Sequence, residues 1–544
     1  MSEPMRVLLT TEGTYPYIVG GVSTWCDNLV NGLSGVHWQV LPLTAGGLHR
    51  QARFELPSNA ELFGHVDLWT EAVHAWNPFG RARHDRSALP AELVRGLLGW
   101  ESDLSLLVEA LLWCRANPSR VRPVFRSKAG WNAYLEGLEG VLAERCVGAG
   151  EAPDLDVLQA TELYQSLYWA ARTAATPTPE GANAPHLLHV TAAGWSGLPA
   201  VLHRHIHGIP LVLTEHGVYV REAYLAAVRS TATASGRWVA SRLARGLARV
   251  AYSAADIVAP VTQANAAWEH ALGVEPERIR TIYNGVLVPH TVTRPPGTKR
   301  VVSVGRIDPL KDVKTMLRTA SAVLSVEPDA NFAHYGPVPE GQAAYARECY
   351  ALHQELALGD RFRFMGPTDE PHEVLAMADV AILSSISEGF PMALLEAMAV
   401  GRPVVATAVG GVSEAITGCG FTAPPGDHES LAAGLVTLLR DPILTRALGE
   451  RAHARVARNF GQAACLESYR SLFEELTGRS AGVVALAPEA GAAAAGASSS
   501  VDVIDLRFAA PNLDDGDGVG IGAATMPSPA SSSKATTAAI TREF

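Results

Sequence analysis

The sequence predicts an α/β protein of two doubly wound, Rossmann-like domains that face a central cleft, with a helical insertion in the first. Short apolar strands alternate with helical segments along most of the 544 residues, which is the pattern of βαβ units. The chain exceeds what one hydrophobic core usually supports, so two domains are expected. A proline-rich stretch at residues 287–298 divides the alternation into two series, because prolines there exclude regular structure.

The first series predicts an amino-terminal domain at residues 1–290. A strand is expected at residues 6–10, then a glycine turn, a helix at about 22–33 and a strand near 36–43. The rhythm stops over about residues 45–180, where runs such as LVRGLLGW and six of the 11 tryptophans predict a mostly helical insertion. It returns with HLLHVT, PLVLTEHG, IVAPV and IRTIYNGV. We expect the insertion to shape the recognition of a substrate (the acceptor of a transferred group) or of a partner protein.

The second series predicts another domain at residues 291–460. The strands KRVVSVGRI, NFAHYG, RFRFMG, VAILSS and PVVAT are each followed by a helix, which predicts a second parallel sheet. A last helix, within residues 461–478, is expected to pack back on the first domain. Beyond it, Ala, Ser, Gly and Asp dominate residues 479–544, and such a composition predicts a disordered tail.

Charge and cysteine content exclude several classes of protein. The formal net charge is −11 without a long Lys/Arg run, so nucleic acid is not an expected partner. Six scattered cysteines without a C-x-x-C pair argue against zinc and disulfides. His203, His205 and His207 alternate at a helix end, where this spacing does not place metal ligands on one face. We therefore expect surface histidines and no metal site.

Location follows from the apolar segments. The amino terminus lacks the long apolar run of a signal peptide, and the sequence contains no stretch of roughly 18 apolar residues that could span a bilayer. The protein is expected in the cytoplasm, or peripherally at the inner face of the plasma membrane.

The strongest functional pattern is EGFPMALLE, which follows the strand VAILSS and begins a helix. Pro391 suits a first helical turn, and the backbone N–H groups there form an anion-binding site. One glutamate can meet sugar hydroxyls and the other ribose hydroxyls. The alternative, two solvated surface carboxylates, fits the strand–loop–helix context less well. The candidate residues here for binding a sugar nucleotide, the donor of a transferred sugar, are Glu388, Gly389, Phe390, Pro391, Met392, Ala393 and Glu396.

Two further loops carry phosphate-binding features. Arg306 and Lys311 follow the first strand of the second domain, where their positive charges suit a diphosphate; a solvent-exposed helix start is the alternative. Gly20 and Gly21 precede the first helix, where glycine lets backbone approach a phosphate or sugar closely. This loop is not G-x-G-x-x-G, so a dinucleotide is not indicated; the alternative is a turn without a ligand.

His216 lies in Thr-Glu-His-Gly at the end of the strand PLVLTEHG. Reactive groups in such folds stand at the carboxyl ends of strands. The alternative is a buried, hydrogen-bonded histidine.

Together the E-x7-E pattern at Glu388 and Glu396, the Gly-Arg-x4-Lys at Arg306 and Lys311, and the Gly-Gly loop resemble the retaining glycosyltransferases of family 4, which have the GT-B fold. The opening TEGTYPYIVGGVSTW, the TEHGVY element and the long early insertion more narrowly resemble the PelF-like exopolysaccharide glycosyltransferases. The resemblance covers roughly residues 5–477.

The resemblance implies a nucleotide-sugar donor, UDP-glucose or a related UDP-hexose, and a glycan acceptor in exopolysaccharide biosynthesis. It also implies that the domain at residues 1–290 is on the acceptor side and that the domain at residues 291–460 binds the donor. Arg306 and Lys311 then neutralise the diphosphate, so that neither a metal nor a cofactor is needed. Glu396 holds the ribose, while His216 and Glu388 stand at the transferred sugar. Membrane-embedded polysaccharide synthase subunits are the implied partners.

Three other readings remain open at this point. The chain could be a transferase with a small soluble acceptor, or a related phosphorylase, although no lysine site for pyridoxal phosphate is identifiable. It could also be a non-catalytic sugar-nucleotide-binding subunit of a polysaccharide synthase.

Overall fold

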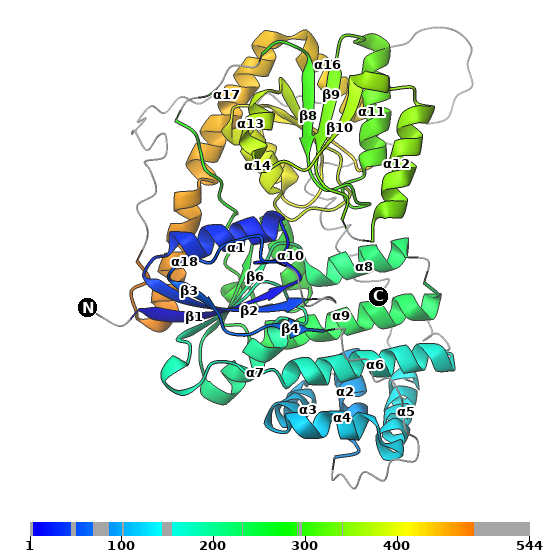
Figure 1. The fold of residues 1–544 in the computed structure, drawn as a ribbon, viewed down its shortest axis with the longest axis vertical. Coiled ribbons are helices and arrows are strands. Elements are labelled where there is room, and N and C mark those ends of the chain that lie inside the picture. The colour runs from blue at the N-terminus through cyan, green and yellow to red at the C-terminus, as the bar shows by residue number, and fades with distance from the viewer. Residues whose placement is uncertain are drawn as a thin grey trace. The chain divides into compact units, whose positions relative to one another are not determined.

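A computed structural model gives the fold of the chain (Figure 1). It describes residues 4–44, 51–68, 86–100, 103–143, 155–230, 232–290, 292, 296–339 and 341–482. Most of the expected tail, from residue 483 onward, lies outside these residues.

The first sheet is parallel and, within the described residues, has seven strands in the order β3-β2-β1-β5-β6-β7, with β4 beside β2. Val7 pairs with Trp38 on one side and with Leu187 on the other, so β1 is central. The strands are β1 (Met5–Glu12), β2 (Val36–Thr44), β3 (Ala60–Leu62), β4 (Val66–Asp67), β5 (Leu187–Val190), β6 (Leu211–Glu215) and β7 (Ile257–Pro260).

One face of this sheet is covered by helix α1 (Gly21–Gly32) and helix α18 (Gln462–Thr477). Tyr469 and Phe473 of α18 are fully buried with Trp25 of α1 and Trp38 of β2 in one cluster. Figure 1 shows α18, in orange, beside α1, in blue. The last helix thus contributes its apolar side to the core around β1, although it follows the second sheet in sequence.

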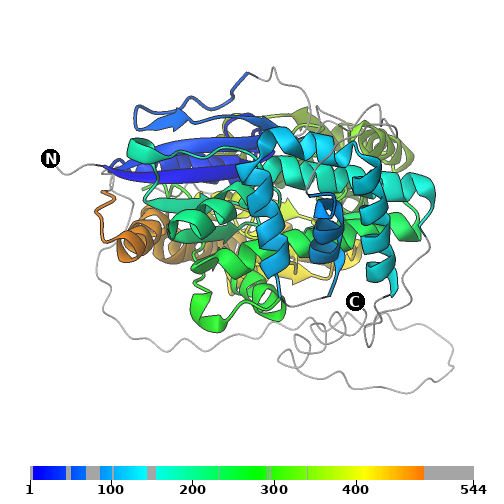
Figure 2. The same cartoon turned by 90° about the horizontal axis from the view of Figure 1, so that it is seen from below.

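The other face carries α7 (Gly197–His207), α8 (Tyr219–Arg229), α9 (Ala234–Ala254) and the insertion; α10 (Gln263–Ala271) follows β7. Five described helices between residues 89 and 174 confirm the predicted insertion and group together (Figure 2). The expected start near residue 45 is wrong, because residues 60–62 and 66–67 form strands β3 and β4, which pair with β2 in the first sheet. Its four described tryptophans, Trp100, Trp113, Trp131 and Trp169, are half-buried; the remaining two lie outside the described residues. The insertion helices are α2 (Leu89–Leu98), α3 (Ser105–Ala116), α4 (Pro118–Phe125), α5 (Lys128–Ala143) and α6 (Val157–Ala174).

The second sheet is also parallel, with six strands in the described part of the chain in the order β10-β9-β8-β11-β12-β13. Its strands are β8 (Arg300–Val304), β9 (Asn331–Tyr335), β10 (Phe362–Gly366), β11 (Val380–Leu383), β12 (Val404–Thr407) and β13 (Gly420–Ala423). Its helices are α11 (Val313–Val326), α12 (Ala343–Glu355), α13 (Pro371–Ala376), α14 (Met392–Ala399), α15 (Val412–Ile416), α16 (His428–Arg440) and α17 (Pro442–Asn459).

Both sheets reverse their strand order at one place, between β1 and β5 in the first and between β8 and β11 in the second. This is the strand order of doubly wound nucleotide-binding folds, and ligands bind at the carboxyl ends of the strands where the order reverses. The predicted fold class, two doubly wound α/β sheets, is confirmed. The same topology marks where a site is to be sought.

Two expectations are wrong in detail. The segment IRTIYNGV forms no strand but only isolated bridges, at Ile279 and Val286. His203 is fully buried and its Nδ1 lies 2.8 Å from Thr178 Oγ1, whereas His205 and His207 are exposed as expected. His203 faces inward because helix α7 packs its Leu198–Leu202 side on the sheet.

None of the helices described by the structure is both long and apolar enough to cross a membrane.

Candidate functional site

The strand-order reversal of the second sheet brings Lys311 and Glu388 together. Lys311 stands in the loop after β8 and Glu388 in the loop after β11. The Lys311 Nζ lies 2.6 Å from Glu388 Oε1, and the Ser385 hydroxyl donates to the same oxygen at 2.5 Å. The side chains are only 22% and 9% exposed. The reversal therefore holds a partly desolvated ion pair, which interacts more strongly than a surface pair.

Arg306 stands in the same loop as Lys311 but points elsewhere. Its Nε lies 2.8 Å from Asp308 Oδ2, and its side chain is 48% exposed. The other carboxylate oxygen of Asp308 accepts the N–H groups of Leu310 and Lys311 at 3.0 and 3.1 Å. Asp308 thus fixes the loop that carries both cations, and the exposed Arg306 guanidinium stays accessible to an anion.

Gly389 brings the loop after β11 against the first sheet. A Cβ atom on Gly389 would stand 1.4 Å from the carbonyl oxygen of His216, so no side chain fits there. The Gly389 carbonyl accepts the N–H of Gly411 at 2.8 Å. A Cβ on Gly410 would meet the Glu388 carbonyl oxygen at 1.9 Å. Gly389 and Gly410 therefore permit the close contact of backbone segments that positions Glu388.

Phe390 offers its backbone rather than its ring to this site. Its side chain is 3% exposed and packs against Tyr283 and Phe460, at centroid distances of 5.3 and 5.0 Å. Its carbonyl accepts the Asn284 Nδ2 at 2.9 Å. The ring of this predicted donor-binding residue is part of the core, so only its backbone can take part in binding.

Two helix N-termini converge beside the Lys311–Glu388 pair. A Cβ on Gly21, the first residue of α1, would lie 3.5 Å from Met392 Cγ, and Met392 is the first residue of α14. Pro391 precedes α14 with an extended backbone, and space around Gly20 is open. The N–H groups of a first helical turn, including those of Met392 and Ala393, have no intrahelical acceptor. Two positive helix ends thus face one place, which suits a diphosphate.

Glu396 follows within α14, where it is half-buried. Burial raises the pKa of its carboxyl to about 7. Such a carboxyl accepts hydrogen bonds best once it ionises, near neutral pH.

His216 follows β6, and its ring packs edge-on against Trp25 of α1 at 4.5 Å between centroids. Burial lowers the pKa of His216 to about 3. Its buried Nε2 makes no hydrogen bond among the described residues, and buried polar atoms without a partner are rare. His216 is therefore a neutral imidazole that can hydrogen-bond to a ligand.

The comparisons with known proteins agree with this geometry. Residues 5–277, about half of the chain, match the family described as "Domain of unknown function (DUF3492)", and residues 298–441 match "Glycosyl transferases group 1". The D-inositol 3-phosphate glycosyltransferase of Corynebacterium efficiens is 30% identical over 303 residues, covering 52% of this chain and 69% of that protein. The chain belongs to the group 1 glycosyltransferases.

One further sequence and one solved structure are similar to this glycosyltransferase. The N-acetyl-alpha-D-glucosaminyl L-malate synthase of Bacillus anthracis is 32% identical over 182 residues, or 33% of this chain; the chain spans about half of that relative (46%). The crystal structure of Anabaena Alr3699/HepE superposes with a TM-score of 0.53 at 15% identity, covering 86% of this chain and 99% of that one. This likeness confirms the predicted GT-B fold.

In this glycosyltransferase, sequence reasoning missed Arg221, which joins the two sheets. Its Nη2 donates to the Glu388 carbonyl at 3.1 Å, and its Nη1 donates to Asn265 Oδ1 at 3.2 Å. The Ser387 hydroxyl donates to Glu222 Oε1 at 2.8 Å. Arg221 lies in the first turns of α8 without a motif of its own. Only its closeness to His216 in sequence could have drawn attention to it.

Glu215, the neighbour of His216, points into the core of the first domain. It accepts the Tyr219 N–H at 2.9 Å and the Tyr252 hydroxyl at 2.5 Å. Glu269 lies next to it, and burial together with the Glu215 charge raises the pKa of Glu269 above its usual value. These groups anchor the start of α8, which carries Arg221. Glu215 is thus structural, although it stands at a strand end.

No group of three or more His, Cys, Asp or Glu side chains in the described ranges is placed to hold a metal ion.

Proposed function

We propose that the chain is a retaining glycosyltransferase of family 4 that transfers a hexose from a UDP-hexose, UDP-glucose or a close relative, to a glycan acceptor. The observation that carries the proposal is the Lys311–Glu388 pair, which stands where the strand order reverses and beside two converging helix N-termini. A diphosphate needs positive charge and N–H donors, and a sugar needs a carboxylate acceptor. This place offers all three.

In the proposed complex, Lys311 and Arg306 neutralise the diphosphate together with the N-termini of α1 and α14. Charge-assisted hydrogen bonds of this kind are the strong ones. With two side-chain cations and two helix dipoles at the leaving group, we expect transfer without a divalent metal or cofactor. Gly20 and Gly21 leave room for phosphate oxygens close to the backbone.

The sugar and the ribose are assigned to the carboxylates of the E-x7-E pattern. Glu388 and the N–H groups around Gly389 hold hydroxyls of the hexose, and the neutral imidazole of His216 hydrogen-bonds from the side of the first sheet. Glu396 holds the ribose hydroxyls. The loop at residues 364–368 flanks the nucleobase, as the resemblance to family 4 implies. The Gly366 carbonyl at the end of β10 accepts the Gly336 N–H at 2.8 Å, which ties this loop to the end of β9.

Transfer proceeds on one face of the sugar in this proposal. The bond from the anomeric carbon to the diphosphate breaks with its electron pair leaving on the phosphate oxygen. The acceptor hydroxyl oxygen forms the new bond from the same side, and its proton passes to the departing diphosphate. The enzyme then acts by orienting both reactants and stabilising negative charge on the leaving group.

We choose UDP and glucose as the donor components because the crystal structure of the structural neighbour Alr3699/HepE is a complex with UDP and glucose. We infer a PelF-like enzyme of exopolysaccharide synthesis from the opening glycine-containing block and the helical insertion. On this assignment, partner subunits of a membrane-embedded synthase recruit the chain to the inner face of the plasma membrane.

The test is donor turnover with the purified full chain. UDP-glucose, UDP-galactose, UDP-N-acetylglucosamine and GDP-mannose are incubated separately, and released sugar is followed by proton NMR. One UDP-sugar should be hydrolysed, with the α-anomer appearing first. Binding without any turnover, with or without added oligosaccharides, would favour the non-catalytic sugar-nucleotide-binding subunit. Initial β-anomer would overturn retention.

A further inference from the structure

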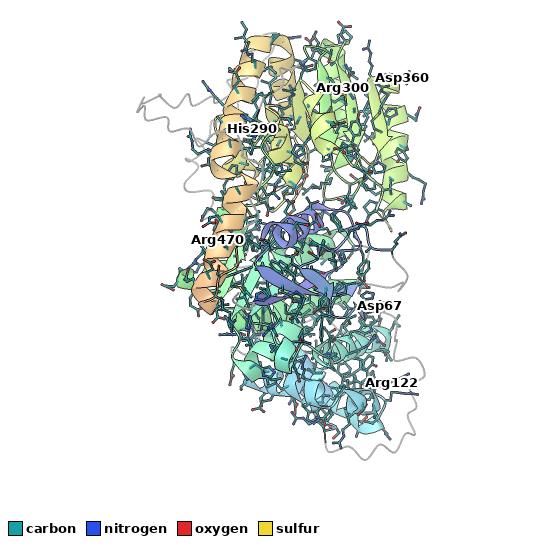
Figure 3. All side chains as sticks on the ribbon, turned by 60° about the vertical axis from the view of Figure 1, so that its left-hand side comes forward. Asp67, Arg122, His290, Arg300, Asp360 and Arg470 are labelled. Carbon is teal, nitrogen blue, oxygen red and sulfur yellow. The ribbon has the colours of Figure 1, made fainter. Side chains whose placement is uncertain are left out.

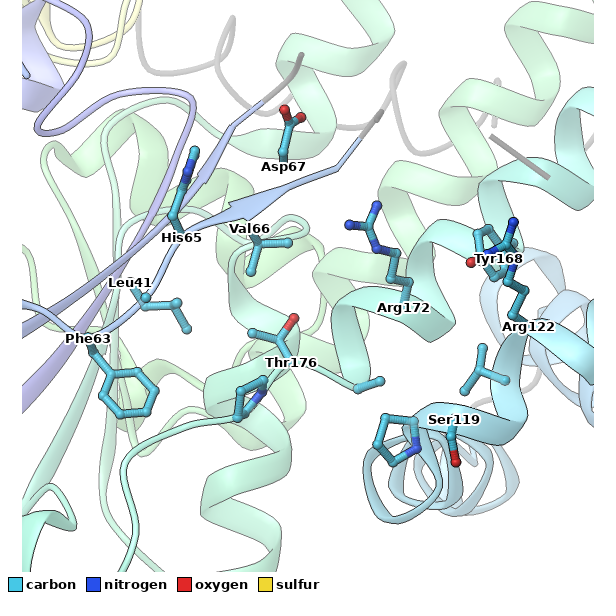
Figure 4. A pocket seen from close by; sticks show the side chains of 15 residues that line it. Leu41, Phe63, His65, Val66, Asp67, Ser119, Arg122, Tyr168, Arg172 and Thr176 are labelled. Atoms are coloured by element: carbon cyan, nitrogen blue, oxygen red, sulfur yellow. The ribbon is translucent and has the colours of Figure 1, made fainter. Parts of the chain in front are cut away.

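A pocket lies between the first sheet and the insertion, apart from the Lys311–Glu388 pair. It is formed by β2, the segment Phe63–Asp67 and helices α4 and α6, and its volume is about 540 Å³. Pockets of roughly 300–1,000 Å³ are typical of small-molecule sites. Figure 4 shows the lining side chains. We call it the insertion pocket, and its principal lining residues are Phe63, His65, Asp67, Arg122, Tyr168 and Arg172.

Arg172 lies in the last turn of α6 and lines the insertion pocket. Its guanidinium points from α6 toward the strand that carries Val66 and Asp67 (Figure 4). The Nη1 is buried and makes no hydrogen bond among the described residues. A buried donor on a cation is costly unless an acceptor meets it. One donor of Arg172 therefore remains without an acceptor at the wall of the pocket.

The charge of the lining favours an anion. Arg122 of α4, an exposed residue, and Arg172 of α6 both line the pocket, whereas Asp67 is the single carboxylate among its lining residues. Asp67 and Arg122 come from separate elements on the same side of the structure (Figure 3). Arginine forks match the planar carboxylate and the phosphate group. Phe63 and Pro177 add apolar surface of the kind that lines ligand pockets.

The insertion pocket adjoins the loop that leads to the diphosphate site. His65 Nε2 lies 2.7 Å from Thr44 Oγ1, at the carboxyl end of β2. The His65 ring contacts Tyr17 at 5.3 Å between centroids. Tyr17 belongs to the loop between β1 and α1, which ends at Gly20 and Gly21. A saccharide seated in the pocket thus lies against the loop that faces the donor.

We propose that the insertion pocket binds a carboxylate or phosphate group of the acceptor, which makes the acceptor an acidic saccharide. This inference rests on the proposed function, because only a transferase has an acceptor. It assigns the insertion a substrate-recognising role that is separate from donor chemistry.

Calorimetric titration of the full chain, with UDP at saturation to occupy the donor site, tests this proposal. The probes are digalacturonate for a carboxylate, glucose 6-phosphate for a phosphate, and cellobiose as the neutral control. At least one acidic probe should bind, and cellobiose should bind at least about tenfold more weakly, as expected for loss of a charge-assisted contact. Which acidic probe binds identifies the source of the anion.

The variants are Arg172→Gln and Arg122→Gln. The matched control is Arg120→Gln, which makes the same charge change on α4 outside the pocket lining. Both pocket variants should weaken the acidic probe about tenfold, while Arg120→Gln should not. UDP affinity and donor hydrolysis should stay unchanged in all three. Arg172→Lys keeps the charge if Arg172→Gln does not fold.

The insertion pocket is overturned as an anion site if cellobiose binds as tightly as the acidic probes. It is also overturned if Arg120→Gln weakens the acidic probe as much as the pocket variants do, or if a pocket variant loses donor hydrolysis together with probe binding. Absence of any probe binding overturns it as well. UDP binding is measured in the same samples, so failure of the donor site is recognised separately.

Discussion

The ammonium group of Lys311 lies 2.6 Å from the carboxylate of Glu388, although 77 positions separate the two residues in the sequence. The loops after β8 and β11 meet because the strand order reverses between these neighbouring strands. The Glu388 carboxylate is held by Lys311 and Ser385, so it faces the site in a fixed orientation. A diphosphate would share Lys311 with Glu388, which couples the donor's phosphates to its sugar contact.

Replacing either cation should weaken nucleoside diphosphate binding. Lys311→Ala and Arg306→Ala each remove a charge-assisted contact, and each should reduce UDP affinity by about 1.5–3 kcal/mol and abolish most turnover. Isothermal titration with UDP checks the affinity. Lys314→Ala is the control, because Lys314 of α11 pairs with Glu348 of α12 at 2.6 Å and not with Glu388. If both site variants keep wild-type affinity, the diphosphate assignment is wrong.

Gly389→Ala should abolish turnover without unfolding the chain. The added Cβ would stand 1.4 Å from the His216 carbonyl oxygen, so the loop that carries Glu388 must move away from the first sheet. Steady-state donor hydrolysis and circular dichroism are the measurements. Gly140→Ala in α5 is the control, since a Cβ there meets only Arg95 Nε at 3.9 Å and alanine favours a helix. Unchanged hydrolysis in Gly389→Ala would show that the close contact is dispensable.

Glu396 should make thermal stability depend on pH near neutrality. Burial raises the pKa of its carboxyl from 4.5 to about 7. The folded chain therefore binds this proton more tightly than the unfolded chain. The contribution of the bound proton to the free energy of unfolding is full below pH 4.5 and is lost as the pH rises through 7. Relative to wild type, the Glu396→Gln variant should gain in Tm between pH 5 and 8. A Tm difference that is constant over this range would contradict the raised pKa.

The residues beyond Gly482 should be dispensable for donor chemistry. Their composition cannot sustain a core. The truncation must keep Ala481, which is fully buried and donates its N–H to Glu474 at 3.0 Å. A chain ending at residue 482 should hydrolyse donor at the full-length rate, whereas one ending at residue 479 should lose stability. Lost hydrolysis in a folded chain ending at 482 would assign the tail a catalytic role.

Much of the fold was predictable from local patterns. The apolar strand β11 (VAIL) and the mostly apolar strands β6 and β8 were recognisable in the sequence, since buried parallel strands are nearly continuous in apolar residues. The helix after Pro391 and the loop positions of Arg306, Lys311, Glu388 and His216 followed from motif spacing. The segment IRTIYNGV failed because its alternation resembles a strand, yet its residues bridge neighbours only singly.

The sequence by itself therefore determined the two-sheet α/β class, the helical insertion and the loops in which the candidate residues stand. Only the tertiary structure decided which of them touch. The Lys311–Glu388 pair, the contact of Gly389 with His216, the buried ring of Phe390 and the Arg172 pocket all join segments far apart in the chain. Such contacts depend on strand order and on the packing of helices against the sheets, and local periodicity carries neither.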